Sequence, residues 1–398
     1  MNNKHWLDLI DKYLMHTYSP PPITIVRGQG CRVWDSEGKS YLDLIAGIAV
    51  CSLGHAHPEV AEAISNQAGK LVHTSNLFGT IPQVELAELL VNNSFADKAF
   101  FCNSGAEANE AAIKLARKYS HDRFGTGRYE LISLTGSFHG RTLAALSATG
   151  QTKFHKGFEP LVDGFKHVAA GDLQAMREGI TQKTCAVLME PLQCEGGVIS
   201  FSRDYLNGVR ELCNERGLIL IFDEVQVGMG RTGTVFAYEH YDVKPDILTL
   251  AKALANGLPL GALLAIEDVA RAFTPGTHAS TFGGNPVACS AAKVVVQKLI
   301  EGSLLANCRE MGAYFKEGLE SLAGQYPSLI KDVRGLGLIL GMELTGEGGG
   351  IVKALLEKGF LINCTQGSIL RFAPPLIITK LEIDSLLLAL DKECREML

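Results

Sequence analysis

The sequence predicts an α/β protein with a mainly parallel sheet, and two observations indicate this class. Between residues 97 and 270, short and nearly continuous apolar runs alternate with helical patterns, as expected for strands that helices cover on both faces. Glycine is abundant, with 42 of 398 residues, which is typical of tight turns between packed elements. The apolar runs span residues 98–102, 130–135, 184–190, 218–222, 246–251 and 260–266.

The first 65 residues predict part of a smaller unit. Residues 1–18 have the spacing of an amphipathic helix, and the proline run that follows them is stiff and extended. Two strand patterns, 30–35 and 39–44, flank a turn at residues 36–38. A small antiparallel hairpin is therefore expected near the N-terminus.

Two helices are expected between the apolar runs. Residues 106–119 place several alanines and Leu115 on one helical face. Residues 204–216 place Leu206 and Val209 on one face in the same way. Helices of this kind bury one face against a sheet, which agrees with the α/β class.

From residue 286 onward the pattern is that of an α+β unit. The expected elements are helices over 286–323, a strand over 335–344, a helix over 352–358, strands over 360–363 and 369–372, and a last helix. We therefore divide the chain into an N-terminal segment of a small domain (1–65), a large α/β domain (66–285) and the C-terminal α+β part of the small domain (286–398).

Composition and charge exclude several classes of function. The net charge is −6 without a basic block, which disfavours nucleic-acid binding. No apolar run approaches the roughly 18 residues of a membrane span, and residues 1–18 do not resemble a signal peptide. The ten cysteines form no CxxC pair, and His55 and His57 lack further ligands beside them. The sequence thus predicts a cytoplasmic enzyme with reduced thiols, without a metal site and without nucleic-acid or membrane partners.

One of the apolar runs leads directly into a candidate phosphate site. Ligands of open α/β sheets bind at the carboxyl ends of the strands. After residues 98–102, Ser104 and Gly105 open a helix, and the free N–H groups of a helix start favour phosphate. The alternative is an ordinary helix start with Ser104 as its cap.

Two other runs end at a carboxylate and at an amine. Asp223 follows residues 218–222, and a buried carboxylate needs either a protein arginine or a cationic ligand, such as the protonated nitrogen of a heterocycle. Lys252 follows residues 246–251 and is either a surface lysine or a desolvated amine that can act as nucleophile or base. A phosphate cradle, an acid for a ring nitrogen and a desolvated amine are together the groups that pyridoxal phosphate requires.

The chain resembles the class III, or ornithine-aminotransferase-like, family of pyridoxal-phosphate-dependent aminotransferases of fold type I. The resemblance extends over nearly the whole length, from residues 28–35 (GQGCRVWD) to residues 370–375 (LRFAPP). Its most specific segments are residues 222–233 (FDEVQVGMGRTG) and 251–261 (AKALANGLPLG).

The resemblance implies a mainly parallel seven-stranded sheet flanked by helices, a smaller α+β domain built from both chain ends, and a homodimer with shared active sites. Lys252 would bond to the cofactor, and Asp223 would pair with its ring nitrogen. The implied cofactor-binding residues are Ser104, Gly105, Ala106, Phe138, Asp223, Gln226, Lys252 and Thr281, the last of which would reach the cofactor of the other subunit. The implied substrate-binding residues are Tyr18, Asn76, Arg141, Glu195, Ser280 and Arg371.

The resemblance also implies a reaction. Residues 73–78 (HTSNLF) and 361–363 (LIN) favour the branch that acts on acetylated ornithine. We therefore expect transfer of the terminal amino group of N2-acetyl-L-ornithine to 2-oxoglutarate, a step of arginine biosynthesis. Arg141 would hold the distant carboxylate of the donor, and Arg371 the carboxylate beside the reacting carbon of glutamate. Glu195 would neutralise Arg371 while the first donor is bound.

Other activities remain open on the sequence alone. The same scaffold serves ornithine, succinylornithine and 4-aminobutyrate aminotransferases, an aminomutase and a dialkylglycine decarboxylase, although Glu195 with Arg371 argues against the aminomutase. Residues 228–233 (GMGRTG) match a GxGxxG pattern and would suggest a nicotinamide oxidoreductase, but they do not open a helix directly after a strand. Lys252 argues against a noncatalytic binding protein.

Overall fold

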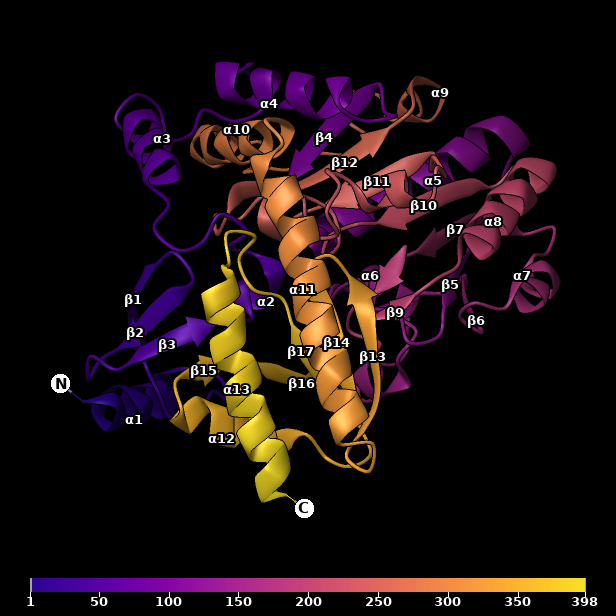
Figure 1. The fold of residues 1–398 in the computed structure, drawn as a ribbon. Helices are drawn as coiled ribbons and strands as arrows, with labels where there is room; N and C mark the ends of the chain where they lie inside the picture. Colours follow the sequence, from indigo (N-terminus) through magenta and orange to yellow (C-terminus); the bar gives the residue numbers. More distant parts are fainter. Residues whose placement is uncertain (1, 398) are drawn as a thin grey trace.

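The computed structural model describes residues 2–397, and its largest element is a seven-stranded sheet (Figure 1). The strand order is β4-β12-β11-β10-β7-β5-β6, and β12 runs antiparallel to β4 and β11 while the other neighbours are parallel. The mainly parallel sheet expected from the sequence is confirmed. Its strands are β4 (Lys98–Cys102), β5 (Glu130–Leu134), β6 (Phe165–Val168), β7 (Thr184–Met189), β10 (Ile219–Asp223), β11 (Ile247–Leu250) and β12 (Gly261–Ala265).

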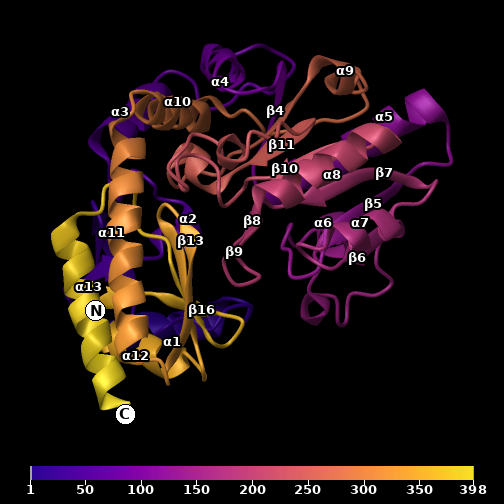
Figure 2. The ribbon, with the colours of Figure 1, turned by 45° about the vertical axis from the view of Figure 1, so that its right-hand side comes forward.

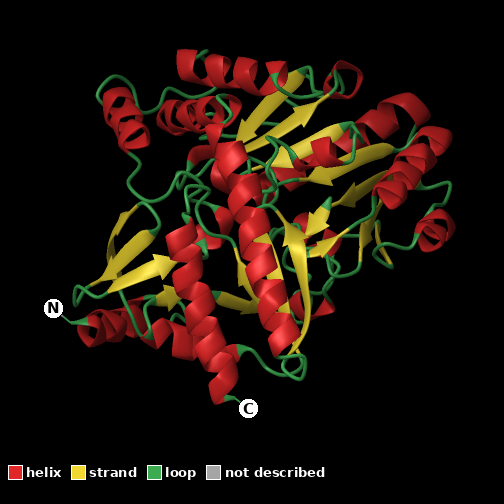
Figure 3. Cartoon of the chain, in the orientation of Figure 1, coloured by secondary structure: helices red, strands yellow, loops and turns green. Residues whose placement is uncertain are grey.

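The central strands send alternate residues to two different hydrophobic clusters. In β10, Leu220 and Phe222 belong to one cluster, whereas Ile219 and Ile221 belong to the other. Helix α8 packs into the first and α5 into the second, so helices lie on both faces of the sheet (Figure 3). Burial on both faces explains why these strands are continuous apolar runs in the sequence. The helices and 3₁₀ turns around the sheet are α3 (Pro58–Ala68), α4 (Ile81–Asn92), α5 (Gly105–Phe124), α6 (Leu143–Ala148), η1 (Thr152–Phe154), α7 (Leu173–Gly179), α8 (Arg203–Arg216), η2 (Ala237–His240), η3 (Lys252–Ala255), α9 (Glu267–Ala270) and α10 (Pro286–Ile300).

The two ends of the chain meet in a second unit. Strand β15 pairs in parallel with β3 and completes the sheet β1-β2-β3-β15, which joins C-terminal to N-terminal residues. A further sheet, β13-β14-β17-β16, is covered by α11, which lies alongside α13 (Figures 1 and 2). The elements are α1 (Asn3–Tyr13), β1 (Ile25–Gln29), β2 (Arg32–Asp35), β3 (Ser40–Asp43), the short α2 (Ala46–Ala49), α11 (Ser303–Gln325), β13 (Ile330–Leu336), β14 (Ile339–Leu344), α12 (Gly349–Glu357), β15 (Phe360–Leu361), β16 (Asn363–Thr365), β17 (Ile369–Phe372) and α13 (Lys380–Glu396). The domain boundaries drawn from the sequence stay a prediction.

Some expected elements differ in the structure. The single strand expected over 335–344 is wrong, because β13 and β14 form a hairpin that turns at Gly337, where φ is +56°. A Cβ atom at Gly337 would lie 2.6 Å from the carbonyl carbon of Thr232, so this close turn requires glycine. Residues 360–363 divide between β15 and β16, which belong to different sheets. Strand β6 was not predicted, because an edge strand with Lys166 and His167 has no continuous apolar run.

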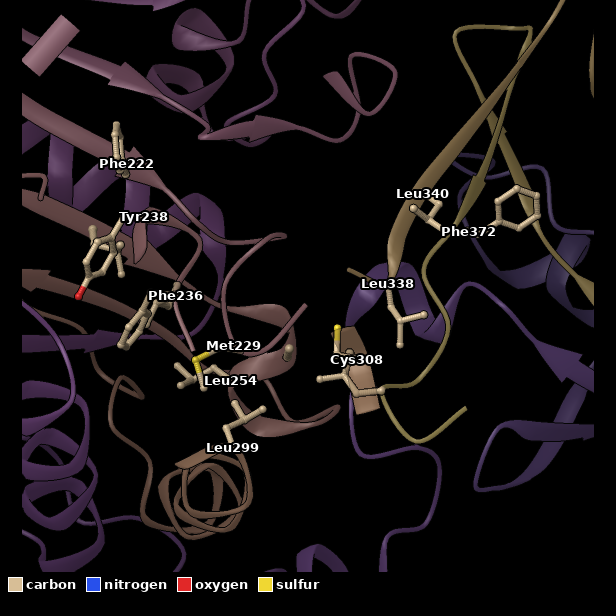
Figure 4. Close-up of a cluster of buried hydrophobic side chains, with 14 of the residues drawn as sticks. Phe222, Met229, Phe236, Tyr238, Leu254, Leu299, Cys308, Leu338, Leu340 and Phe372 are labelled. Atoms are coloured by element: carbon tan, nitrogen blue, oxygen red, sulfur yellow. The ribbon is translucent and has the colours of Figure 1, made fainter. Parts of the chain in front are cut away.

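One hydrophobic cluster extends from the large sheet to the C-terminal sheet (Figure 4). Phe222 contributes from β10 and Phe372 from β17, and both are fully buried. Phe372 also packs edge to face against Phe315 of α11, with ring centroids 5.1 Å apart. Because successive residues of a strand point to opposite faces, burial of Phe372 turns Arg371 toward the other face of β17. The core thereby determines the direction of the Arg371 side chain.

Candidate active site

A cavity of about 410 Å³ lies where β4, β10 and β11 end. Ser104 and Gly105 line it from the segment after β4. Asp223 is the last residue of β10, and Lys252 is the second residue after the end of β11. The structure thus brings together the groups that follow three separate apolar runs. The predicted residues Ala106, Phe138, Arg141 and Gln226 also line the cavity, as do Asn109, His139 and Glu190, which the sequence analysis did not single out.

The N-terminus of α5 forms one wall of the cavity. Ser104 caps the helix, because its Oγ accepts a hydrogen bond from the N–H of Glu107 at 3.2 Å. A Cβ atom at Gly105 would come within 2.6 Å of Val225 Cγ1, so the wall is close-packed at this point. With no side chain at Gly105 and a single methyl group at Ala106, the first N–H groups of this helix border the cavity. Such a wall suits a phosphate group.

Asp223 is almost completely buried, with 4% of its surface exposed. Its Oδ2 accepts hydrogen bonds from Asn109 Nδ2 at 2.7 Å and from His139 Nδ1 at 2.8 Å. Its Oδ1 accepts a hydrogen bond from the Val225 N–H at 3.0 Å. The alternative of a protein arginine as partner is wrong, because these donors are an asparagine, a histidine and a backbone amide. Each carboxylate oxygen has two acceptor sites, so Oδ1 can also accept from the N–H of a bound cation.

Asn109 and His139 hold Asp223 from behind. Both are nearly inaccessible, with 1% and 2% of their surfaces exposed. Asn109 Oδ1 in turn accepts a hydrogen bond from Thr249 Oγ1 of β11 at 2.8 Å. His139 stands next to the predicted Phe138 in the chain and could have been suspected on that ground. Nothing in the sequence marks Asn109, which becomes a neighbour of Asp223 when α5 packs on the sheet.

Lys252 begins the turn η3 in a left-handed conformation, with φ of 46°. This conformation costs a residue with a side chain about 1–2 kcal/mol and is found mostly where the surrounding structure enforces it, often at functional sites. Burial lowers the pKa of the Lys252 ammonium below its ordinary value, and the negative charge of Glu195 offsets part of this shift. The amine therefore loses its proton more readily than a surface lysine does, which suits a nucleophile or a base.

Glu190 follows β7 and brings a second acid to the cavity. It is 5% exposed, and its Oε2 accepts a hydrogen bond from the backbone N–H of Phe138 at 3.1 Å. Burial, followed by the negative charge of Asp223, raises the pKa of Glu190 well above its ordinary value. A neutral carboxyl group at this position avoids repulsion with Asp223 and fixes the backbone that carries the Phe138 ring.

Glu195 and Arg371 meet beside the cavity. Glu195 lies at the tip of the hairpin formed by β8 (Leu192–Gln193) and β9 (Ile199–Ser200), which projects toward the C-terminal sheet (Figure 2). Arg371 Nη1 donates to Glu195 Oε1 at 2.5 Å. Gln226 donates to the same Glu195 oxygen at 3.2 Å and accepts from Arg371 Nη1 at 3.2 Å. Burial alone would raise the pKa of Glu195, but the charge and hydrogen bond of Arg371 outweigh it and hold this pKa below its ordinary value.

Four predicted residues lie away from this cavity. Asn76 Nδ2 donates to the backbone oxygen of Ser280 at 3.0 Å, and Ser280 and Thr281 line a separate cavity of about 350 Å³. Tyr18 is 87% exposed. Within the described part of one chain, these residues do not reach the cavity that holds Lys252, and the roles expected for them stay predictions.

The GMGRTG segment has a structural role. Arg231 within it is fully buried, and its Nη1 donates to the backbone oxygen of Leu338 at 3.0 Å, at the β13–β14 turn. The next element is the 3₁₀ turn η2 and not a helix that opens on glycine. A dinucleotide-binding loop follows a strand directly and opens a helix at its glycines, so the structure argues against the oxidoreductase alternative.

A metal ion and a membrane are two further kinds of partner. Among residues 2–397, no group of three or more His, Cys, Asp or Glu side chains is arranged to hold a metal ion. His55 instead bonds through Nε2 to Asp43 Oδ2 at 2.7 Å. In the same part of the chain, no helix has both the length and the apolar surface needed to cross a bilayer.

The residues around the cavity fit pyridoxal phosphate. The α5 N-terminus offers N–H groups to a phosphate, and Phe138 offers a flat face to an aromatic ring. Asp223 offers a carboxylate to a pyridine nitrogen, and Lys252 offers an amine to an aldehyde.

Comparison with known proteins agrees with this fit. The family model for class-III aminotransferases matches residues 13–393. The chain is 52% identical to the acetylornithine aminotransferase of Methanocaldococcus jannaschii over 400 residues, which cover 100% of both chains. It superimposes on the crystal structure of the ornithine aminotransferase from Toxoplasma gondii with a TM-score of 0.96 and 33% identity, covering 100% of this chain and 96% of that one. The N-acetylornithine aminotransferase from Stenotrophomonas maltophilia matches with a TM-score of 0.85 and 38% identity, over 98% and 99% of the two chains.

These matches cover almost the whole chain, and they place the seven-stranded sheet and its cavity among enzymes that transfer amino groups. The expectation of a pyridoxal-phosphate enzyme of fold type I is confirmed. The chain belongs to the class-III aminotransferase family.

Proposed function

We propose that the protein transfers the terminal amino group of N2-acetyl-L-ornithine to 2-oxoglutarate and yields N-acetylglutamate 5-semialdehyde and glutamate. The observation that carries this proposal is the ion pair between Glu195 and Arg371 beside the cavity. It provides a cation that is neutralised for one substrate and available to the other. The full-length similarity to enzymes named acetylornithine aminotransferase supports the choice of donor.

The two substrates place their charges differently. In N2-acetylornithine the carboxylate lies far from the terminal amine, and Arg141 at the cavity is the cation for it. Glutamate and 2-oxoglutarate have an additional carboxylate beside the reacting carbon, and Arg371 is the cation for that group once Glu195 moves away. A planar guanidinium binds each carboxylate through two hydrogen bonds. One site thus accepts both substrates in turn.

Each residue of the cavity has a different role in the proposed reaction. When bound, pyridoxal phosphate supplies an electron sink for the negative charge that develops at the carbon bearing the amino group. Lys252 Nζ removes the proton from that carbon and acts as general base. Asp223, held by Asn109 and His139, would keep a proton on the ring nitrogen of the bound cofactor. Phe138 would hold the cofactor ring, and Glu190 fixes the Phe138 backbone.

We further propose a homodimer with shared active sites, located in the cytoplasm. Leu77, Phe78 and Phe282, the residue after Thr281, are large apolar residues that are 85%, 66% and 60% exposed. The rings of His73 and Phe282 contact each other with centroids 5.3 Å apart, which brings the segment that carries Leu77 and Phe78 near Phe282. Exposed apolar patches of this kind mark protein interfaces. All ten cysteines are free thiols, as is usual in a reducing compartment.

Mixing two inactive variants tests the shared site. In a shared dimer, Lys252→Ala and Thr281→Ala subunits form mixed dimers in which one site has both residues intact. Random mixing should then restore up to about one quarter of the wild-type sites. Light scattering on the wild type should give twice the mass of the chain. A monomer, or a mixture as inactive as its parents, would contradict the shared-site proposal.

Single-turnover rates test the substrate. The holoenzyme is mixed separately with N2-acetylornithine, N2-succinylornithine, ornithine and 4-aminobutyrate, and the change in cofactor absorbance is followed. We expect the largest kcat/KM for N2-acetylornithine. A larger value for ornithine, succinylornithine or 4-aminobutyrate would replace the proposed donor and leave the aminotransferase class intact.

A further inference from the structure

Arg141 reaches the cavity without an acidic partner. Its side chain is exposed, and among residues 2–397 the structure shows neither an ion pair nor a hydrogen bond to its guanidinium. A long arginine side chain without partners samples many rotamers. To be oriented for a substrate carboxylate, the Arg141 guanidinium therefore needs a contact that is neither an ion pair nor a hydrogen bond.

Two aromatic rings provide that contact. The Arg141 guanidinium lies 4.1 Å from the centroid of the Phe154 ring and 5.6 Å from that of Phe138. The two rings pack edge to face, with centroids 5.8 Å apart and planes at 81°. Phe138 lines the cofactor cavity, so the stack connects the cofactor site to Arg141. A guanidinium lying over a ring keeps its N–H edge free for a carboxylate.

Phe154 itself is held rigidly. It ends the turn η1, and buried residues anchor the chain on both sides of it. Before the turn, Gln151 Nε2 donates to the backbone oxygens of Gly136 and Ser137, both at 3.1 Å. After the turn, His155 Nε2 donates to the backbone oxygen of Thr149 at 2.8 Å. The ring is thus fixed relative to the loop that carries Phe138.

We propose that Phe154 is a positioning residue that orients Arg141 for the distant carboxylate of the amino donor, and that it thereby sets the preference for donors with such a carboxylate. The inference rests on the proposed function, because the proposed function is what assigns the distant donor carboxylate to Arg141. Holding the guanidinium before the substrate arrives reduces the ordering cost of binding, so the effect belongs to KM and not to the chemical step.

A matched pair of donors isolates this effect. N-acetyl-1,4-diaminobutane has the amide and the terminal amine of N2-acetylornithine but lacks the carboxylate. In the holoenzyme, Phe154→Leu removes the ring face and keeps an apolar side chain. We expect KM for N2-acetylornithine to rise about 3- to 30-fold, the range that a lost cation–π contact covers. We expect kcat for both donors, and KM for N-acetyl-1,4-diaminobutane, to stay within about twofold of wild type because neither depends on Arg141.

Two further variants control for structural effects. Phe154→Tyr keeps the ring face, so its KM for N2-acetylornithine should equal that of the wild type. Lys153 Nζ lies 5.0 Å from the centroid of the Phe154 ring and donates to Gln366 Oε1 at 3.3 Å. Lys153→Met removes this second cation and should leave the KM values of both donors unchanged. Equilibrium binding provides a readout apart from turnover. The dissociation constant of N2-acetyl-L-norvaline, which has the carboxylate but no terminal amine, should rise in Phe154→Leu by the same factor as KM.

The outcomes separate this inference from the proposed function. If Phe154→Leu changes KM equally for the two donors, or changes neither, the positioning role is overturned. If the wild type does not turn over N2-acetylornithine, the proposed donor is wrong. The comparison then passes to 5-aminopentanoate and pentylamine, which again differ by a distant carboxylate. A selective rise of KM for 5-aminopentanoate would support the role of Phe154 even then, and equal changes would overturn it.

Discussion

Arg371 Nη1 lies 2.5 Å from Glu195 Oε1, although 176 positions separate the two residues in the chain. Gln226, which lines the cavity, is hydrogen bonded to both. Opening this ion pair therefore also releases hydrogen bonds of a residue at the cofactor site. The state of the pair and the surroundings of the cofactor are coupled through one amide side chain.

Replacement of Glu195 should separate the two half-reactions. In Glu195→Gln, Arg371 would remain an unpaired, buried cation while N2-acetylornithine is bound, and leaving one charge of a buried pair unpaired costs about 2–5 kcal/mol. We expect the donor half-reaction to slow about 30-fold or more, and the glutamate half-reaction, in which Arg371 meets a carboxylate, to slow less than about threefold. Stopped-flow single turnovers with each substrate measure this, and equal losses would contradict the switch.

Lys252→Ala should abolish turnover and leave cofactor binding partly intact. The variant loses the general base and the covalent bond, and we expect kcat to fall by about 10³-fold or more. The phosphate wall and Asp223 remain, so cofactor should still bind but dialyse away and resist fixation by borohydride. Lys252→Arg keeps the charge and should be equally inactive. Wild-type turnover in either variant would remove Lys252 from the mechanism.

Asp223→Ala should reduce kcat by about 10²- to 10³-fold, the size of a lost electrostatic contact in an active site. A cofactor analogue methylated on its ring nitrogen has a permanent positive charge and should restore part of the loss. Thr249→Val, which removes only the hydrogen bond to Asn109 behind Asp223, is the matched control and should have a small effect. If the analogue restored nothing, the role of Asp223 at the ring nitrogen would be wrong.

The pair of His55 and Asp43 should make stability depend on pH. The hydrogen bond that the His55 ring donates to the Asp43 carboxylate, followed by a hydrogen bond with Cys51, raises the pKa of His55 from 6.5 to about 10. Because the pKa is higher in the folded state, the stabilisation is fully present below pH 6.5 and is lost as pH rises toward 10.

His55→Gln should therefore lower the thermal midpoint at pH 6, by an amount that corresponds to about 1–3 kcal/mol for a hydrogen bond to a charged group. The difference from wild type should shrink steadily and nearly vanish above pH 10. His5→Gln, at an exposed position of α1, is the control and should show no such trend. A difference that stayed constant from pH 6 to pH 10 would contradict the pKa shift.

Much of the site was predictable because each essential group directly follows an apolar run. Gly105 and Lys252 come after β4 and β11, and Asp223 is the last residue of β10. The carboxyl ends of these strands lie at one edge of the sheet, so the three residues reach the same cavity. The pairing of Glu195 with Arg371 came from family resemblance and not from spacing. Asn109 escaped notice because an asparagine inside a helix has no sequence signal for a partner on another strand.

The sequence by itself determined the alternation of strands and helices, the order of the groups along the chain, and the cofactor chemistry that they can support. It did so because burial on both faces, helix starts and strand ends leave local patterns. The tertiary structure alone decided that 335–344 turns at Gly337, that residues 360–363 divide between two sheets, and that the Arg141 guanidinium lies on Phe154. These features depend on contacts between segments that are distant in the chain. Such contacts form and stabilise the fold only when the whole core packs together.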